Sequence, residues 1–133
     1  MDNYEEKYKK ALLLKDLSAR WPYGVKGIIT YDKSNTTFTV EGIDNNVLHL
    51  SDAEECYVED FKSYLRPMRS ITEEEIKELS KIDIKRIIFS ARHLTWHLDG
   101  EIIDYLNKKM LDWRGLIPRG LAIEAPEGMY NIK

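Results

Sequence analysis

The chain has 133 residues, of which 43% are hydrophobic and 32% are charged, and its formal net charge is −3 at pH 7. These values are typical of a folded protein, and the length fits one compact domain over residues 1–133. The negative total charge provides no general cationic field, so nucleic-acid binding stays open but is not favoured. No apolar run reaches the ~20 residues of a membrane span, and the N-terminus lacks a secretion signal. We therefore expect a cytoplasmic protein without membrane contact.

The first predicted element is an amphipathic helix over residues 3–14, which should lie on a sheet. Its apolar positions at helical spacing are Tyr4, Tyr8, Ala11 and Leu12. Residues 18–24 are expected to break this pattern. Trp21 precedes a proline and is pushed toward extended geometry, and Gly24 permits a turn.

Four short strands are predicted next, from alternating apolar and polar residues bounded by turn-type sequences. They cover residues 25–31, 36–43, 47–50 and 58–66, and the acidic residues 52–55 are expected to form a solvated connection. Short antiparallel strands curl to cover their apolar face. We therefore expect an α+β protein. A small curled antiparallel sheet or barrel of the Src-homology type, about residues 20–66, should pack with the N-terminal helix and a C-terminal helical half.

The helical half is predicted to begin at Thr72. The Thr72 hydroxyl can accept a hydrogen bond from the amide of Glu75 while the Glu75 carboxylate reaches back, which is a capping box. Residues 84–98 fit a helix at their start and a strand at their end, and both interpretations stay open. A further helix is expected over residues 101–110.

His93 and His97 are the candidates for a metal site, because two histidines four residues apart on a helix can bind one ion. In a strand the same spacing separates the rings by about 13 Å, and the alternation at residues 94–98 favours a strand. We therefore expect no metal, no cofactor and no catalytic residue. The single cysteine, Cys56, excludes an internal disulfide and is expected to be a small buried or edge residue and not a nucleophile.

Exposed rings are the alternative means of binding. Four aromatic residues form the predicted interaction surface for a peptide or a single strand of nucleic acid: Trp21, Tyr23, Tyr31 and Trp96. Their competing role is core packing, which large rings dominate in small proteins. Several cations recur through the middle of the chain, namely Lys77, Lys81, Lys85, Arg86 and Arg92. Glutamates in the same region favour a solvated helix over a groove for phosphates.

The last 22 residues, 112–133, combine three glycines and two prolines with short apolar runs, so this tail is predicted to be folded. We expect a helical turn over residues 116–119, closed by a left-handed Gly120, and then an extended run over residues 121–124. The residues expected to dock the tail are Asp112, Trp113, Arg114, Gly115 and Gly120. Arg20 and Arg114 are predicted to tie the tail to the sheet through carbonyls or a carboxylate.

Three ordered blocks of sequence carry a family resemblance: residues 18–25, residues 64–68 running into 72–75, and the tail. In the tail, an aspartate-aromatic-Arg-Gly-Leu-Ile block precedes Gly-Leu-Ala and Ala-Pro-Glu-Gly-Met-Tyr. The chain thereby resembles a family of small hypothetical proteins from gut-bacterial genomes, often in phage or mobile-element contexts. The resemblance implies that setting and no activity.

From these features we expect a non-enzymatic accessory protein that binds another macromolecule, with an unknown protein as its partner. The alternatives are a nucleic-acid-associated binding module, and a small metal-dependent enzyme that uses His93 and His97. The sequence leaves the oligomeric state open.

Overall fold

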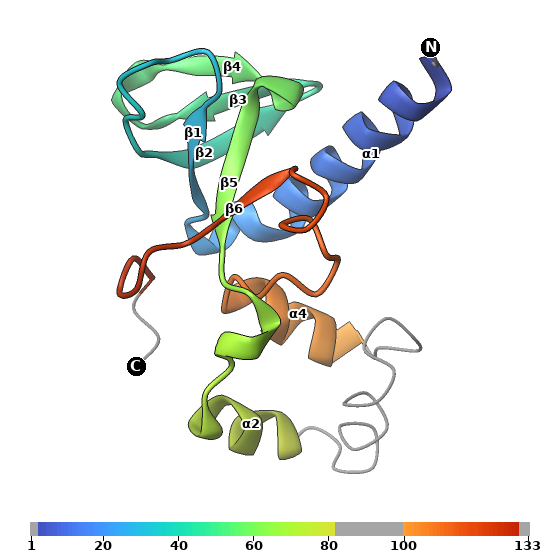
Figure 1. Cartoon of the computed structure of the whole chain (residues 1–133), viewed down its shortest axis with the longest axis vertical. Helices are drawn as coiled ribbons and strands as arrows, with labels where there is room; N and C mark the ends of the chain where they lie inside the picture. Colours follow the sequence, from blue (N-terminus) through green and yellow to red (C-terminus); the bar gives the residue numbers. More distant parts are fainter. Residues whose placement is uncertain (1–2, 82–99, 131–133) are drawn as a thin grey trace.

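The computed structural model describes residues 3–81 and 100–130 and confirms the predicted α+β class (Figure 1). Its helices are α1 (Asn3–Arg20), α2 (Glu73–Ser80) and α4 (Gly100–Lys108). Its strands are β1 (Lys26–Ile29), β2 (Phe38–Asp44), β3 (Val47–Leu50), β4 (Glu55–Tyr57), β5 (Phe61–Leu65) and β6 (Ala122–Glu124). Single 3-10 turns are η1 (Trp21–Tyr23), η2 (Ser51–Ala53), η3 (Val58–Asp60) and η4 (Met68–Ser70). Residues 84–98, for which both helix and strand were left open, lie outside the described residues, as do His93, Trp96 and His97 within them.

The strands form a six-stranded mixed sheet in the order β4-β3-β2-β1-β5-β6. Pairing is antiparallel from β4 to β5, whereas β6 runs parallel to β5. The pairing expected to be antiparallel over residues 20–66 is antiparallel in β1 to β5, and β6 from the tail makes the whole sheet mixed. The chain passes through α2 and α4 between β5 and β6, and such a long connection allows a parallel return. Among the described residues the sheet is not closed, since β4 and β6 are its two edges.

The first helix is longer than predicted and buries a different face. It continues to Arg20, where Asp16 and Arg20 form an ion pair four residues apart. Leu13 and Leu17 join the core, whereas Tyr8 stays 57% exposed. The prediction that the Tyr8 face packs on the sheet is wrong, because a second stripe carries larger aliphatic side chains to the sheet. The N-terminal half of α1 projects from the rest of the molecule (Figure 1).

The predicted strand over residues 58–66 is two elements, η3 and β5, and β4 before it was not predicted. The hairpin from β3 to β4 turns through Asp52 and Ala53, which both have a positive φ, 62° and 60°. Hairpin turns of this kind usually carry Asn or Gly at such positions. The Asp52-Ala53 pair therefore did not indicate a hairpin turn in the sequence, and residues 52–55 were predicted to be a solvated loop.

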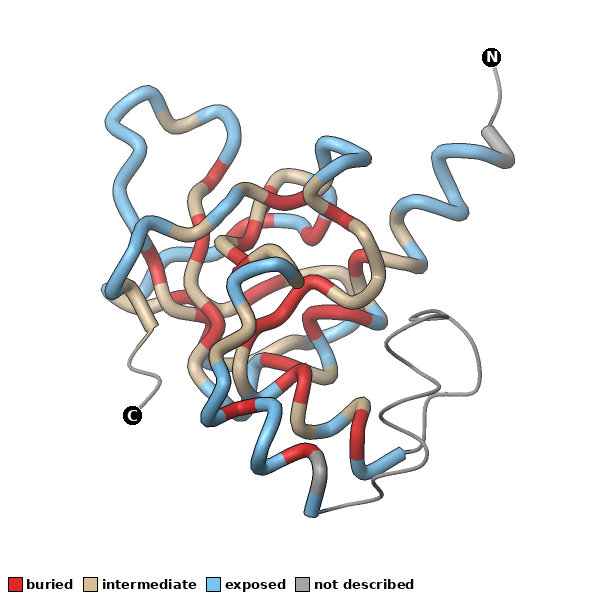
Figure 2. Tube along the Cα trace, turned by 60° about the horizontal axis from the view of Figure 1, so that its bottom comes forward, coloured by how far each residue is buried: buried red, intermediate tan, exposed pale blue. Residues whose placement is uncertain are grey.

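Two buried clusters hold these elements together. The larger joins α1 to the sheet and to the tail through Leu116, and it includes Cys56 as predicted. The smaller lies between α2 and α4 around Leu79 and Leu106. Figure 2 shows buried segments running through the strands and the helix faces that meet them. The capping box at Thr72 is confirmed, since the Glu75 amide donates to the Thr72 hydroxyl (3.1 Å) and the Thr72 amide donates to the Glu75 carboxylate (2.9 Å).

Candidate binding groove beside the first helix

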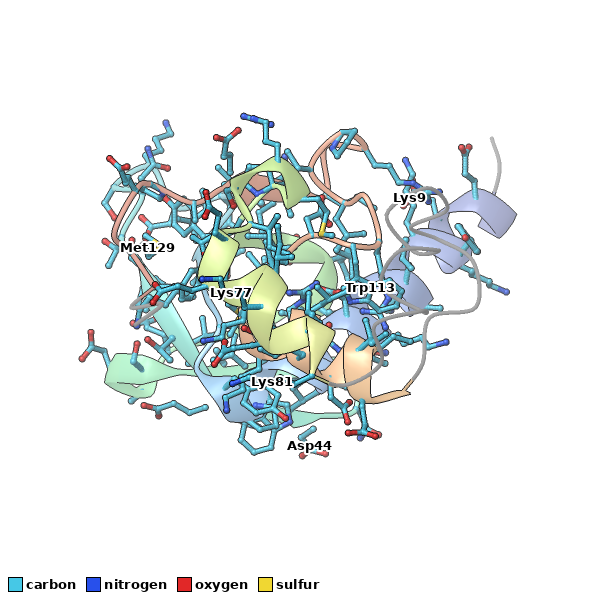
Figure 3. All side chains as sticks on the ribbon, turned by 90° about the horizontal axis from the view of Figure 1, so that it is seen from below. Lys9, Asp44, Lys77, Lys81, Trp113 and Met129 are labelled. Carbon is cyan, nitrogen blue, oxygen red and sulfur yellow. The ribbon has the colours of Figure 1, made fainter. Side chains whose placement is uncertain are left out.

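A groove of about 440 Å³ lies between α1 and the tail. One wall is a face of α1: Tyr8, Leu12 and Lys15 are spaced four and three residues apart and therefore share it. Tyr8 and Lys15 are exposed there, whereas Leu12 also packs against the edge of the core. The other wall belongs to α4, through Ile103, and to the tail, through Trp113, Arg114 and Arg119. Figure 3 shows Trp113 where α1 and α4 come together.

Main-chain hydrogen bonds shape the tail wall. The Asp112 carboxylate accepts from the amides of Leu116 (2.8 Å) and Ile117 (2.9 Å), so one buried side chain closes the turn. Gly115 and Gly120 have a positive φ, 74° and 76°, which glycine adopts without steric cost. The predicted turn with a left-handed Gly120 is confirmed, as is the extended run that follows it as β6.

Trp113 forms the rigid part of the apolar wall. Its indole Nε1 donates to the Oδ1 of buried Asn107 (2.9 Å), which fixes the ring against α4. The guanidinium carbon of Arg114 lies 4.3 Å from the centroid of the same ring. This stacking is a cation–π contact, which orients the guanidinium as well as holding it.

Beneath the groove, one buried carboxylate serves two arginines. The Nε of Arg20 donates to both carboxylate oxygens of Asp16 (3.0 Å each), and the Nη1 of Arg114 donates to Asp16 Oδ1 (2.5 Å). The Nη2 of Arg20 donates to the carbonyl of Leu111 (2.9 Å), which links α1 to the start of the tail. Arg20 and Asp16 are fully buried. Two guanidinium groups facing one carboxylate leave this cluster with an excess positive charge.

In two other hollows of the surface, unlike in the groove, the cations lie beside acidic side chains. The hollow of about 480 Å³ beside η4 contains Arg66 and Arg69, which are paired with Glu75 and Glu124. The hollow of about 460 Å³ between α1 and η3 mixes lysines with glutamates, and Lys10 lies 3.9 Å from Glu59. The described residues that line the groove beside Trp113 include three cations and no acid.

Three of the four residues of the predicted aromatic surface do not line this groove, and the fourth, Trp96, lies outside the described residues. Trp21, Tyr23 and Tyr31 are exposed, by 37%, 46% and 66%, so core packing is not their role. Trp21 and Tyr23 lie in η1 before β1, and Tyr31 lies beyond the other end of β1, so the strand separates them. Sequence reasoning missed Tyr8, Leu12 and Lys15 as groove residues because the apolar spacing of Tyr8 and Leu12 was assigned to the core.

The buried thiol of Cys56 is unsuited to nucleophilic chemistry at neutral pH. Burial, with Asp60 and Glu59 nearby, raises the pKa of this thiol to about 12, so it stays protonated. Across residues 3–81 and 100–130, no three histidine, cysteine or acidic side chains gather as metal ligands would. The helices in these ranges also lack the combination of length and apolar character that a membrane span requires.

Comparisons with protein-family models, with curated proteins and with solved structures found no match to this chain.

Proposed function

We propose that the chain is a non-enzymatic accessory protein that acts by binding another macromolecule in the groove between α1 and the tail. A phage or mobile-element setting and a cytoplasmic location belong to the same proposal. The setting extends the family resemblance, and the location extends the expectation that a chain with a single cysteine works in a reducing compartment.

The lining of the groove is the observation that carries this proposal. Apolar and aromatic side chains with a few fixed polar groups are typical of a binding site, and Trp, Tyr and Arg are the residues that contribute most at interfaces. Here Tyr8, Trp113 and Arg114 come together from the two ends of the chain. Main-chain and buried side-chain hydrogen bonds hold the tail residues, so they need little ordering when a partner binds.

The structure also gives a reason to keep a nucleic-acid partner as a second candidate. Aromatic rings beside cations form stacking platforms for single strands, and the groove has Trp113 and Tyr8 beside Lys15 and Arg119. Of the cations in the predicted basic region, Lys77 lies on α2 and Lys81 directly follows its last residue, both away from Trp113 (Figure 3). Lys85, Arg86 and Arg92 lie outside the described residues.

We further propose that β1 to β5 form a curled sheet of the Src-homology type. The supporting observations are that β1 to β4 form a meander, that β5 returns to pair with β1, and that only the turn η3 separates β4 from β5. A bulge at Glu41 bends β2 where its pairing changes from Val40–Leu50 to Gly42–His49.

Affinity capture from cells that carry the native gene tests the proposed function. A groove variant with Lys15→Glu and Arg119→Glu is compared with a control that carries Lys77→Glu and Lys81→Glu. The control makes the same change of charge on α2 and at the residue that follows it. The side chains replaced in both variants are exposed. We expect one macromolecule to be enriched by the natural chain and by the control, and recovered roughly tenfold less by the groove variant. Identical recovery with all three chains would contradict the proposal.

A further inference from the structure

We infer that the occupant of the groove is an acidic peptide segment of a partner protein. Its carboxylates would pair with the cations of the groove, and one of its apolar side chains would pack against Trp113. This inference rests on the proposed function and gives it a substrate class. Four observations support it: the charge of the groove, the fixing of Arg114, the apolar surface, and the small extent of the positive region.

The charge of the groove calls for an anion. Its described lining residues carry three positive charges and no negative one. Asp16 accepts from both Arg20 and Arg114, so its single negative charge is shared by two guanidinium groups and leaves a net positive charge. An incoming carboxylate would therefore reduce an excess of positive charge that the protein leaves uncompensated.

Arg114 is fixed in advance for such a contact. Its guanidinium donates to Asp16 through Nη1 and stacks on the Trp113 ring, and its side chain is only 10% exposed. A guanidinium presents several donors in a rigid fork, so holding one edge leaves other donors oriented. Arginine that is already ordered loses little side-chain entropy when it binds a carboxylate. Lys15 and Arg119 are exposed at the same groove and can adapt to neighbouring acids.

The apolar surface sets a second requirement on the segment. Tyr8 is 57% exposed, and Leu12 and Ile103 are half-buried in the same groove. A leucine, isoleucine or aromatic side chain of the ligand would cover these groups and exclude water from the charge contacts. Acids alternating with apolar residues satisfy both requirements at once.

The surroundings favour a short acidic segment over a nucleic acid. A phosphate backbone carries charge along its length and is bound by cations that follow it. The described lining of the groove has three cations, Lys15, Arg114 and Arg119, so its positive region is short. A short positive region suits the few carboxylates of a peptide better than a continuous phosphate backbone.

Selection from a displayed library of random peptides tests this inference. The bait is the full chain, and the counter-bait is the full chain with Tyr8→Ala and Arg119→Glu. A control chain carries Tyr57→Ala and Lys77→Glu; Tyr57 on β4 is 58% exposed, which matches Tyr8. Thermal melting establishes that all three are folded. We expect the natural chain and the control to enrich peptides with two or more acids beside a leucine, isoleucine or aromatic residue.

Synthetic copies of the enriched peptides then give the affinity by fluorescence anisotropy. We expect roughly tenfold weaker binding to the counter-bait, and a similar loss when the acids of the peptide are changed to Gln or Asn. Neutral or basic consensus peptides, equal binding to the counter-bait, or no enrichment would overturn the inference. Groove-dependent binding of labelled oligothymidylate in place of peptides would also overturn it but leave the proposed function standing. Failure of peptides and oligothymidylate alike to depend on the groove would count against both.

Discussion

At the residue scale, Gly27 in β1 shows where the sheet tolerates no side chain. A Cβ atom at this position would lie 2.4 Å from the carbonyl oxygen of Lys62 and 2.5 Å from the ring of Phe61. Phe61 is 1% exposed and belongs to the main core, so its ring cannot move aside without disturbing its neighbours. Glycine is required here by close packing, although its φ is ordinary.

We expect Gly27→Ala to lower the free energy of unfolding by about 3 kcal/mol, because the added methyl group must displace backbone and a buried ring. Gly42→Ala in β2 is the matched control, since the nearest atom to its Cβ would be His49 Cβ at 3.9 Å. Urea denaturation of both variants measures the difference. An equal change in the midpoint for both would show that the close approach at Gly27 is not limiting.

Single residues also show what the sequence could and could not reveal. Thr72 and Glu75 were predicted correctly because a capping box is local and needs only their spacing. Tyr8 was assigned to the core because helical periodicity marks an apolar stripe without saying which stripe meets the sheet. Asp16 went unnoticed, since its importance comes from Arg114, 98 residues away.

At the element scale, Arg66 at the end of β5 anchors α2. Its guanidinium makes two hydrogen bonds to Glu75, of 2.7 and 2.8 Å, and also donates to the carbonyls of Ser70 and Lys109. Burial alone would raise the pKa of Glu75. The side-chain hydrogen bonds from Arg66, the backbone hydrogen bond from Thr72 and the positive charge of Arg66 outweigh burial and lower it.

This lowered pKa predicts acid sensitivity. The ionised Glu75 stabilises the fold at pH values above the ordinary pKa of glutamate, 4.5, and this contribution is lost as the pH falls through the lower pKa of the folded state. We expect Glu75→Gln to cost roughly 3 kcal/mol at neutral pH, because it leaves Arg66 buried without a counter-charge. The difference from the natural chain should shrink steadily in acid.

Urea denaturation at a series of pH values measures this dependence. Glu73→Gln is the control, because Glu73 is exposed in the first turn of the same helix and contributes only through the helix dipole. A pH-independent difference between the Glu75 variant and the natural chain would contradict the assignment.

Elements differ in how well the sequence predicted them. The second and third strands and the helix after Gly100 lie close to their predicted ranges, since each has clear periodicity and flanking turn residues. The end of α1 was placed too early, because Trp21 before proline indicated extended geometry and the Asp16–Arg20 pair that completes the last turn was not weighed. The strand β4 has three residues, too few for alternation to be recognised.

At the scale of the whole molecule, the tail closes the core. Leu116 is fully buried with residues of α1 and the sheet, and β6 covers one edge of β5. Further along, the hydroxyl of Tyr130 accepts from the amide of Lys26 (2.8 Å) and donates to the carbonyl of Tyr64 (2.7 Å), which ties β1 to β5. Burial raises the pKa of Tyr130 to about 12, so this hydroxyl keeps its proton at neutral pH.

Removal of residues 112–133 should therefore destabilise the whole fold by several kcal/mol, as a large core truncation does, and thermal melting measures the loss. A shorter deletion of residues 126–133 keeps Leu116 and β6 while removing Tyr130, and we expect a smaller drop in melting temperature. A truncated chain that melts like the natural one would show that the tail is dispensable.

The architecture as a whole was predictable only in part. Composition and periodicity gave the α+β class and an N-terminal helix with strands after it. The parallel return of β6 depends on how far the chain travels between two strands, and the open edges depend on strand order, neither of which a local pattern encodes.

The contact between Asp16 and Arg114 has a consequence for protein synthesis. A ribosome makes α1 before the tail. The Asp16 carboxylate on α1 therefore gains its contact with the Arg114 guanidinium only after 98 more residues have been added. Until Arg114 has been added and has left the ribosome, the nascent chain keeps an apolar face and an incomplete ion cluster open to chaperones. Messages that stop short of the tail should therefore yield products that cellular proteases remove quickly.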